Sequence, residues 1–457
     1  MSTIHRLQND LSPHPPSAGP QGAVGNPRIA PGDIAIGVII GRASEYFDFF
    51  VYGIASVLVF PALFFPFEYR LQGTLYAFVI FSFAFVARPL GTVVFMALQR
   101  RMGRGPKLTM ALFLLGSSTA GIAFLPGYAT LGFASIVLLA VLRVGQGIAL
   151  GGSWDGLPSL LALSAPRARR GWYAMLGQLG APVGFILATG LFAFLYAGLT
   201  SDEFLSWGWR YPFFVAFAIN VVALFARLRL VVAEEYEELL SKRELEPSGI
   251  GDLLRSQGPN LTLGAFAALA SFALFHVVTV FPLSWILLYS KQSVVEFLLV
   301  QIVGGALGAG GIVASGWLAD RFGRQRTLGA CAALIAVFSG FAPTLLDGGT
   351  LGQDVFILVG FALLGLSYGQ AAGAMNANFE PRFRYTGAAL TADLAWLIGA
   401  GFAPLVALGM SAHFGLAYVS LYLLSGAICT LGAIALGLVL GGAGGRRDPD
   451  GDERRVS

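Results

Sequence analysis

Residues 320–324 read Asp-Arg-Phe-Gly-Arg, and residues 100–104, which lie 220 positions earlier, read Arg-Arg-Met-Gly-Arg. Each stretch lies between two long apolar segments. A second pair of loops repeats at nearly the same spacing, because residues 166–171 read Pro-Arg-Ala-Arg-Arg-Gly and residues 381–387 read Pro-Arg-Phe-Arg-Tyr-Thr-Gly. Two matched loops at nearly one spacing predict a repeated unit of six apolar segments.

The apolar segments around these loops are long enough to cross a membrane. Stretches of about 20 residues span the hydrocarbon as helices, and a helix satisfies its own backbone polar groups in lipid. We expect spans at residues 34–60, 73–98, 107–126, 130–164, 171–198, 209–232, 259–289, 294–319, 326–346, 351–378, 386–411 and 414–441. Only 12% of the residues are charged, which is about half the usual share of a soluble domain. The sequence therefore predicts an all-α membrane protein with twelve transmembrane helices in two pseudo-symmetric six-helix bundles.

The polar segments set the predicted domain boundaries. We expect a disordered cytoplasmic tail at 1–32, an N-terminal six-helix bundle at 33–232, a cytoplasmic linker at 233–258, a C-terminal six-helix bundle at 259–441 and a cytoplasmic tail at 442–457. The first tail is rich in Pro, Gly and Ser and has no apolar core, so no signal peptide is visible. The linker is rich in Glu, Lys and Arg, which is typical of a solvated amphipathic stretch.

The distribution of basic residues predicts the orientation, because cytoplasmic loops carry an excess of Lys and Arg. With the N-terminus in the cytoplasm, the outside loops hold only three of the 29 basic residues, Arg70, Arg210 and Lys291. Three others lie within spans, and the remainder lie in cytoplasmic loops and tails. We therefore predict a multi-pass protein of the bacterial inner membrane with both termini in the cytoplasm.

Short motifs carry a family resemblance. They include Glu-Tyr-Phe-Asp-Phe-Phe-Val-Tyr-Gly at 45–53, Ala-Arg-Pro-Leu-Gly at 87–91, Leu-Arg-Val-Gly-Gln-Gly at 142–147, Gln-Leu-Gly-Ala-Pro at 178–182, Trp-Gly-Trp-Arg-Tyr-Pro-Phe at 207–213 and Arg-Tyr-Thr-Gly at 384–387. With the six-plus-six layout, they make residues 34–440 resemble the major facilitator superfamily and, within it, the metabolite:proton symporter family. Members of that family import small solutes such as di- and tricarboxylates, shikimate, proline and betaine.

The chain departs from the family pattern at two places. The loop of the first half normally has an Asp where this chain has Arg100, and the family's Gly-Gly-Glu-Trp-Gly-Gly is Gly-Gly-Ser-Trp-Asp-Gly at residues 151–156. A carboxylate is therefore lost at Ser153, and another is present at Asp155. These changes bear on the gating contacts of the first half and on proton coupling.

Ionisable residues inside the predicted spans are candidates for function. A charge at the bilayer centre costs roughly 2.5–3.5 kcal/mol on insertion scales, so each such residue needs a partner or a water-filled cavity. The residues that share this property are Arg42, Glu45, Asp48, Arg88, Arg143, Asp155, His276 and Asp393.

The first and fourth spans provide the candidates for proton coupling and substrate binding. Glu45, Asp48 and Tyr52 share one helix face because their spacing is i, i+3, i+7. Asp48 and Arg143 each lie about 20 Å from one membrane surface, in the central zone where transporters bind their substrates. Such a carboxylate suits proton coupling; the alternative is a permanent ion pair that ties helices together. Arg143 resembles the fourth-helix arginine that the superfamily uses for proton coupling or carboxylate binding.

Further candidates belong to the same two groups. Arg42 provides a second anion contact or else extends towards the cytoplasm, and Asp155 replaces the carboxylate missing from the family motif. The full set for proton coupling and substrate is Asp48, Glu45, Arg143, Arg42, Gln146 and Asp155. The set for helix packing and gating is Arg88, Gly147, Asp320, Arg321, Gly323 and Arg324, the last four because they resemble the loop that latches helices in the superfamily.

Three weaker candidates are His276, Asp393 and Asn376, which we interpret first as hydrogen-bonded packing residues. Trp285 and Trp396 are interpreted as lipid-belt or packing residues. The four histidines and two cysteines have no metal-ligand spacing. No enzymatic nucleophile or dyad is evident, so the sequence predicts neither an enzyme nor a cofactor or metal.

The sequence thus predicts a secondary active transporter that imports a small organic solute, a carboxylate, with a proton by alternating access. Three arginines inside the spans favour an anion. Uptake of a zwitterion such as betaine or proline remains an alternative, as does export of a small organic solute. A sensor that has lost transport is a remote alternative. The expected partners are the solute, the proton and the lipid bilayer, with no nucleic acid, and the expected state is a monomer.

Overall fold

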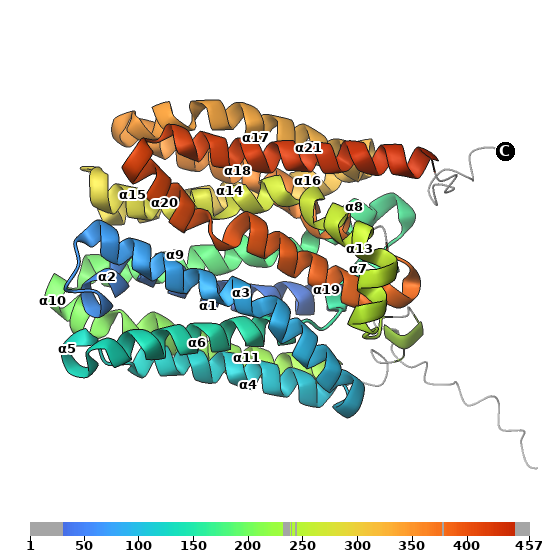
Figure 1. Cartoon of the computed structure of the whole chain (residues 1–457), viewed down its shortest axis with the longest axis horizontal. Helices are drawn as coiled ribbons and strands as arrows, with labels where there is room; N and C mark the ends of the chain where they lie inside the picture. The colour runs from blue at the N-terminus through green and yellow to red at the C-terminus, as the bar shows by residue number, and fades with distance from the viewer. Residues whose placement is uncertain (1–30, 232–237, 239, 243–244, 377–378, 444–457) are drawn as a thin grey trace, which may run out of the picture.

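The computed structural model describes residues 31–231, 238, 240–242, 245–376 and 379–443. The regular elements in this part of the chain are all helices, and they run roughly parallel to one long axis (Figure 1). The predicted tails lie almost entirely outside the described residues, so their disorder stays a prediction.

The first half contains six long helical segments. Its elements are α1 (Pro31–Leu58), α2 (Phe60–Phe64), α3 (Arg70–Met102), α4 (Arg104–Phe124), α5 (Tyr128–Leu131), α6 (Phe133–Gly152), α7 (Leu157–Ser164), η1 (Arg167–Arg169), α8 (Arg170–Leu176), η2 (Gly177–Leu179), α9 (Gly180–Gly198), α10 (Ser201–Glu203), η3 (Phe204–Gly208) and α11 (Arg210–Val231). The element η3 is one turn of π-helix.

The second half repeats this arrangement. Its elements are α13 (Ile250–Ala267), α14 (Leu269–Thr279), α15 (Phe281–Tyr289), α16 (Val294–Phe322), α17 (Arg324–Asp347), α18 (Gly349–Asn376), η4 (Pro381–Phe383), α19 (Arg384–Ala395), η5 (Trp396–Gly401), α20 (Ala403–Phe414) and α21 (Ala417–Ala443). Two spans are interrupted: α14 gives way to α15 just before Pro282, and the π-helix η5 lies just before Pro404. Both breaks precede a proline, which cannot donate a backbone hydrogen bond.

Eleven of these segments are long and apolar enough to cross a membrane. The helix α1 is not among them, because every 18-residue window of α1 contains Arg42, Glu45 and Asp48. Since α1 runs alongside α9 in the bundle, it completes the twelve spans. The architecture confirms the predicted fold of two pseudo-symmetric six-helix bundles.

Helix pairs repeat between the halves. In the first half α3 packs along α6 and α4 along α11; in the second half the corresponding pairs are α16 with α18 and α17 with α21. Glycines permit this close packing: a Cβ at Gly147 would collide with the carbonyl oxygen of Ala84, and one at Gly365 with that of Gly308. The predicted role of Gly147 in close helix approach agrees with this contact.

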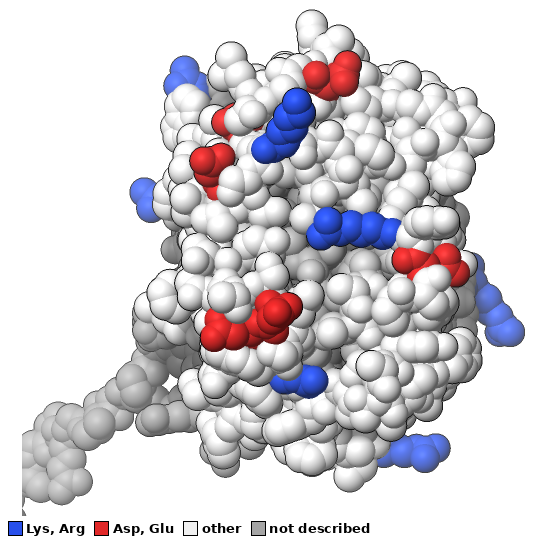
Figure 2. All heavy atoms as spheres, turned by 90° about the vertical axis from the view of Figure 1, so that its left-hand side faces the viewer, with Lys and Arg blue, Asp and Glu red and all other residues white. Residues whose placement is uncertain are grey.

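The two ends of the bundle differ in the loops they carry. We call the end with the α3–α4 and α16–α17 turns the inner end, because the sequence predicts that it faces the cytoplasm; the opposite end is the outer end. Gly103 and Gly323 make these tight turns with φ values of 85° and 88°, which strain any residue with a Cβ. Figure 2 shows the outer end, where basic and acidic side chains are scattered over a largely uncharged surface.

The helix α13 begins within the range predicted as linker. It starts at Ile250, whereas the seventh span was expected from residue 259. Much of the predicted linker lies outside the described residues, but Leu240 and Leu245 are described and both have 0% exposure. The solvated interpretation therefore does not hold for these two leucines, which pack with Tyr385 and Leu157 in a small core at the inner end.

Candidate functional site

Asp48, on α1, is surrounded by uncharged hydrogen-bond donors. The hydroxyl of Thr119 on α4 lies 2.9 Å from both carboxylate oxygens. Asn220 Nδ2 on α11 donates at 3.2 Å, and Gln146 Nε2 on α6 lies at 3.5 Å. Asp48 is 2% exposed, and no cation of the described chain lies within ion-pair distance of it. The hydrogen bonds that the described residues make to this carboxylate therefore all come from neutral groups.

Arg143, on α6, lies beside this carboxylate without forming an ion pair. Its Nε donates to the carbonyl of Phe81 at 3.2 Å, and its Nη1 donates to Gln146 Oε1 at 3.1 Å. The guanidinium carbon stacks 3.8 Å from the ring centre of Tyr52. Its Nη2 is buried and finds no hydrogen-bond partner among the described residues. Gln146 thus bridges Arg143 and Asp48, and Arg143 keeps an unused donor.

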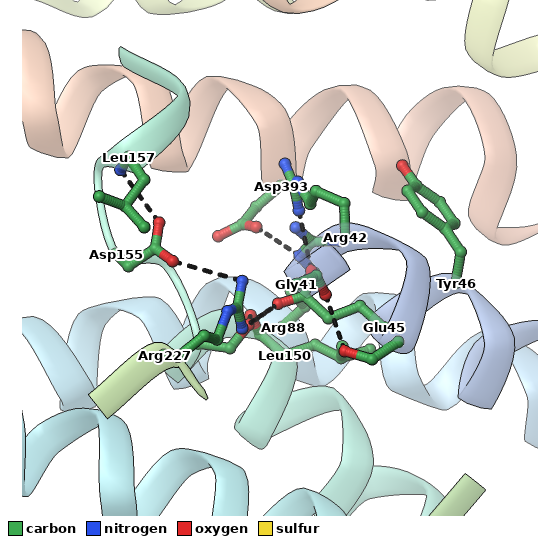
Figure 3. A network of polar contacts seen from close by, with 12 residues as sticks. Gly41, Arg42, Glu45, Tyr46, Arg88, Leu150, Asp155, Leu157, Arg227 and Asp393 are labelled. Carbon is green, nitrogen blue, oxygen red and sulfur yellow. Dashed lines mark hydrogen bonds and ion pairs between the residues drawn. The ribbon is translucent and has the colours of Figure 1, made fainter. Parts of the chain in front are cut away.

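A second group of charges lies nearer the inner end (Figure 3); we call Arg42, Glu45, Asp155 and Arg227 the inner charge cluster. Glu45 Oε2 accepts from Arg42 at 3.0 Å, while Glu45 Oε1 accepts from Arg227 at 2.7 Å and from the Ser153 hydroxyl at 3.0 Å. Arg227 also contacts Asp155 at 3.3 Å. Asp155 thus pairs with Arg227, and the hydroxyl of Ser153, at the position where the family motif has a carboxylate, binds Glu45.

Polar contacts also join the two halves. Arg88 Nε on α3 donates to Asp393 Oδ1 on α19 at 2.7 Å, and Thr92 donates to the other oxygen of the same carboxylate. The hydroxyls of Tyr46 on α1 and Tyr368 on α18 are hydrogen-bonded to each other. Arg88 was predicted to serve helix packing and gating, and Asp393 was interpreted as a hydrogen-bonded packing residue; the structure places the two in one ion pair across the interface.

The loop of the second half latches onto the first half through Asp320. Its two carboxylate oxygens accept the backbone N–H groups of Gly171 at 2.7 Å and Trp172 at 3.1 Å, at the start of α8. The side-chain amide of Gln370 on α18 donates to the carbonyl of Gly171 at 3.2 Å. A carboxylate at the N-terminus of a helix is favourable because unpaired N–H groups and the helix dipole both attract negative charge.

The other predicted members of this loop have separate roles. Arg324 Nη1 donates to the carbonyl of Gly373 at 2.9 Å, which ties α17 to α18 within the second half. Arg321 is exposed, and its guanidinium carbon lies 5.3 Å from the ring centre of Trp317. Gly323 makes the turn between α16 and α17. The contact of this loop with the first half is made by Asp320.

The loop of the first half makes different contacts. Arg100 Nη1 donates to the carbonyl of Ser248 at 3.1 Å, and Arg104 Nη2 donates to the carbonyl of Leu245 at 2.8 Å. The Ser248 N–H in turn donates to the hydroxyl of Thr386 on α19 at 2.9 Å. The chain segment just before α13 is thus held between the two halves.

Tyr385 and Lys107 add to this closure of the inner end. The Tyr385 hydroxyl lies 3.0 Å from both Gln99 Oε1 and the Trp154 carbonyl. Lys107, at 2% exposure, donates to the same Trp154 carbonyl. The two halves also pack along α9 and α16 and along α3 and η5, so the described chain is closed along the interface.

Small cavities remain at the centre of this interface. Their volumes are about 30, 10 and 30 Å³, and Arg42 lines all three. Each has residues from both halves. Such volumes hold water molecules but no organic solute, so a solute can enter only when the halves move apart.

The weaker candidates have mainly packing surroundings. His276, with 0% exposure, lies 3.2 Å through Nδ1 from the Thr279 hydroxyl and stacks on Phe49 at 5.2 Å. Asn376 ends α18, and its side chain lies outside the described part of the chain. Among the described residues, no group of three or more His, Cys, Asp or Glu side chains could hold a metal ion.

Several residues of the site were missed by sequence reasoning. Arg227 and Lys107 were counted with the loop charges, yet the structure buries them at 6% and 2% exposure. Arg227 lies inside the span predicted at 209–232, and that position is the signal that could have identified it. Thr119 and Asn220 carry no comparable signal, since single polar residues are common in membrane helices. Trp396 lines the cavities rather than facing lipid.

Comparisons with known proteins agree with this architecture. The sequence profile of the Major Facilitator Superfamily matches residues 46–393. The chain is 36% identical to the inner membrane metabolite transport protein YhjE of Escherichia coli K12, over 88% of this chain and 93% of the relative. It is 33% identical to the shikimate transporter of the same organism, over 86% and 91%. The crystal structure of a D-xylose-proton symporter superposes with a TM-score of 0.66 at 18% identity, covering 88% of this chain and 96% of that one.

Proposed function

Because the chain belongs to the major facilitator superfamily and is a multi-pass membrane transporter, we propose that it imports a small organic carboxylate together with a proton. In this proposal it is a monomer of the inner membrane with both termini in the cytoplasm. It uses the proton gradient and needs no cofactor. The observation that carries the proposal is the pair of environments on α1: Asp48 has only neutral partners, and Arg42 lines the cavities between the halves.

Asp48 is the best candidate for the proton carrier. Glu45, Asp155 and Asp393 each pair with an arginine, and protonating any of them would remove a negative charge that balances a buried cation, which is costly. Protonation of Asp48 breaks no ion pair, and the nearby Thr119 hydroxyl can donate or accept. Because Gln146 contacts both Asp48 and Arg143, a change in the charge of Asp48 alters the hydrogen bonding of Arg143.

Arg42 is the best candidate for the substrate carboxylate. It shares Glu45 with Arg227, and Arg227 and Ser153 hold the other oxygen of that carboxylate. If Arg42 turns from Glu45 to a substrate, Glu45 keeps two partners and no charge is left unpaired. A guanidinium binds a carboxylate through two parallel hydrogen bonds. The relative named as a shikimate transporter also supports an organic anion as substrate.

Transport requires the contacts between the halves to break on one side at a time. At the inner end these are the Asp320 latch, the Arg88–Asp393 pair and the Tyr385 contacts. Their rupture opens the cavities towards the inner side, and their formation keeps the inner end closed while the outer end opens. This is the alternating access that the fold supports.

The test is accumulation of radiolabelled carboxylates by proteoliposomes with and without an inward proton gradient. We expect gradient-driven accumulation by the wild type. Asp48→Asn should abolish accumulation and keep exchange of labelled for unlabelled substrate, because the site still alternates without a proton. Asp202→Asn, at an exposed acid of the outer end, is the matched control. Equal accumulation without the gradient would rule out symport, and efflux driven by the gradient in oriented vesicles would indicate an exporter.

A further inference from the structure

One of the central cavities, with a volume of about 30 Å³, has one charged side chain and an aromatic wall. Arg42 is the only formally charged residue among the described residues that line this cavity. The aromatic residues around it come from both halves: Trp154, Tyr173, Phe272, Tyr368 and Trp396. A cavity with a single cation and several ring systems differs from a site for a polyanion, which needs several cations.

Trp154, which lines this cavity, has an unused hydrogen-bond donor. The indole Nε1 of Trp154 is buried and has no partner among the described residues. An indole N–H can only donate, so its partner must be an acceptor such as a carboxylate or hydroxyl oxygen. Arg42 and Trp154 line the same cavity, and together they provide a cation and a neutral donor for one carboxylate.

The aromatic wall centres on Trp396. Its ring centre lies 4.9 Å from those of Phe272 and Phe275, with interplanar angles of 69° and 73°. Its neighbour Tyr368 is joined to Tyr46 on the opposite half by a hydrogen bond between hydroxyls. Separation of the halves breaks this bond and exposes two further hydroxyls beside the rings. The wall offers ring faces and edges at distances that suit another ring.

We propose that the transported solute is a monocarboxylate with a ring, whose carboxylate binds Arg42 and Trp154 Nε1 and whose ring packs on the Trp396 wall. This inference rests on the proposed function and narrows its substrate class. A second carboxylate would lie in the aromatic part without a counter-ion, which is unfavourable. A linear acid would leave part of the wall uncovered and would lose conformational freedom on binding. A quaternary ammonium group can also bind to aromatic rings, but this cavity provides no carboxylate to balance its charge.

The experiment is isothermal titration of the purified protein with acids of matched size, with empty micelles as the blank. Benzoate, cyclohexanecarboxylate and heptanoate have equal numbers of carbon atoms, terephthalate adds a second carboxylate, and glycine betaine tests the quaternary ammonium. We expect the two ring monocarboxylates to bind about fivefold or more tightly than heptanoate, terephthalate or glycine betaine. Trp396→Leu should remove this preference. Trp285→Leu, which changes a tryptophan that stacks on Tyr289 near the outer end, should retain it.

The outcomes separate this inference from the proposed function. Equal binding of heptanoate and the ring acids by the wild type would overturn the ring preference and leave carboxylate transport standing. Preferred binding of glycine betaine or terephthalate would also overturn it. Binding of no carboxylate at all would overturn the proposed function itself. The comparison of probes uses the wild type, so it decides the question even if a variant fails to fold.

Discussion

The loops that join α3 to α4 and α16 to α17 occupy equivalent places in the two halves but close the inner end by opposite chemistry. In the second half an acid, Asp320, accepts two backbone N–H groups at the start of α8. In the first half the acid is replaced by Arg100, which with Arg104 donates to carbonyl groups of the segment before α13. The Asp320 latch binds the N-terminus of α8 directly, whereas the Arg100 and Arg104 contacts reach the Thr386 side chain of α19 through Ser248 in the segment before α13.

The difference shows how the chain tolerates the loss of a family residue. An arginine cannot accept hydrogen bonds from a helix N-terminus, so the first-half loop cannot repeat the contact of Asp320. Instead the linker provides carbonyl acceptors to Arg100 and Arg104 and places Leu240 and Leu245 in the small core beside Tyr385. We therefore expect the second-half latch to depend on charge and the first-half latch to depend chiefly on apolar burial.

Among substitutions in the two latches, Leu245→Ala should increase the opening of the inner end most. Replacing a fully buried leucine by alanine costs about 2–5 kcal/mol. This cost destabilises the state in which the inner end is closed relative to the state in which it is open. The parent for this test carries a cysteine in place of Ala372 and lacks Cys331 and Cys429. In everted vesicles, we expect Leu245→Ala to make this cysteine react with an impermeant maleimide at least about 30-fold faster than it does in the parent. Leu254→Ala, at a leucine that is 51% exposed, should leave the rate near that of the parent. An unchanged rate for Leu245→Ala would mean that the linker does not close the inner end.

A smaller effect should follow from Asp320→Asn. The amide keeps one acceptor but loses the charge that favours the helix N-terminus, at a cost of about 1–2 kcal/mol. The labelling rate at the same cysteine should rise about tenfold, and high salt should reduce the difference between variant and parent. Asp347→Asn, at the other end of α17, is the control. The charge-based account of this latch fails if the two variants label at the same rate.

Much of the architecture was predictable from the sequence because its causes are local. Span length, the position of basic loops and the repeat of residues 100–104 at 320–324 depend on neighbouring residues, and the fold confirmed them. The shared face of Glu45, Asp48 and Tyr52 follows from helix periodicity, and all three side chains are buried at 7%, 2% and 0% exposure.

The partners within the site were not predictable, because they depend on contacts between distant segments. Arg227 and Glu45 are 182 residues apart, and Tyr46 and Tyr368 are 322 apart. Trp396 was interpreted as a lipid-belt or packing residue because its span is largely apolar, and hydropathy cannot tell which side faces the other bundle. Leu240 and Leu245 were hidden in a charged segment, where composition indicates solvent.

The smallest effect should come from Arg100→Ala, and it tests whether the first-half latch depends on charge at all. Arg100 is exposed and gives one hydrogen bond to Ser248, a kind of contact that contributes about 0.5–1 kcal/mol. We expect the labelling rate at the Ala372 position to rise at most about threefold, with Arg101→Ala as the neighbouring exposed control. A rise as large as that of Asp320→Asn would show that Arg100 stabilises closure as strongly as an acid would. The two latches would then differ only in the sign of the charge they use. A rise within the predicted limit leaves Leu245 as the main support of the first-half latch, because the arginines then serve to orient the linker over its apolar site.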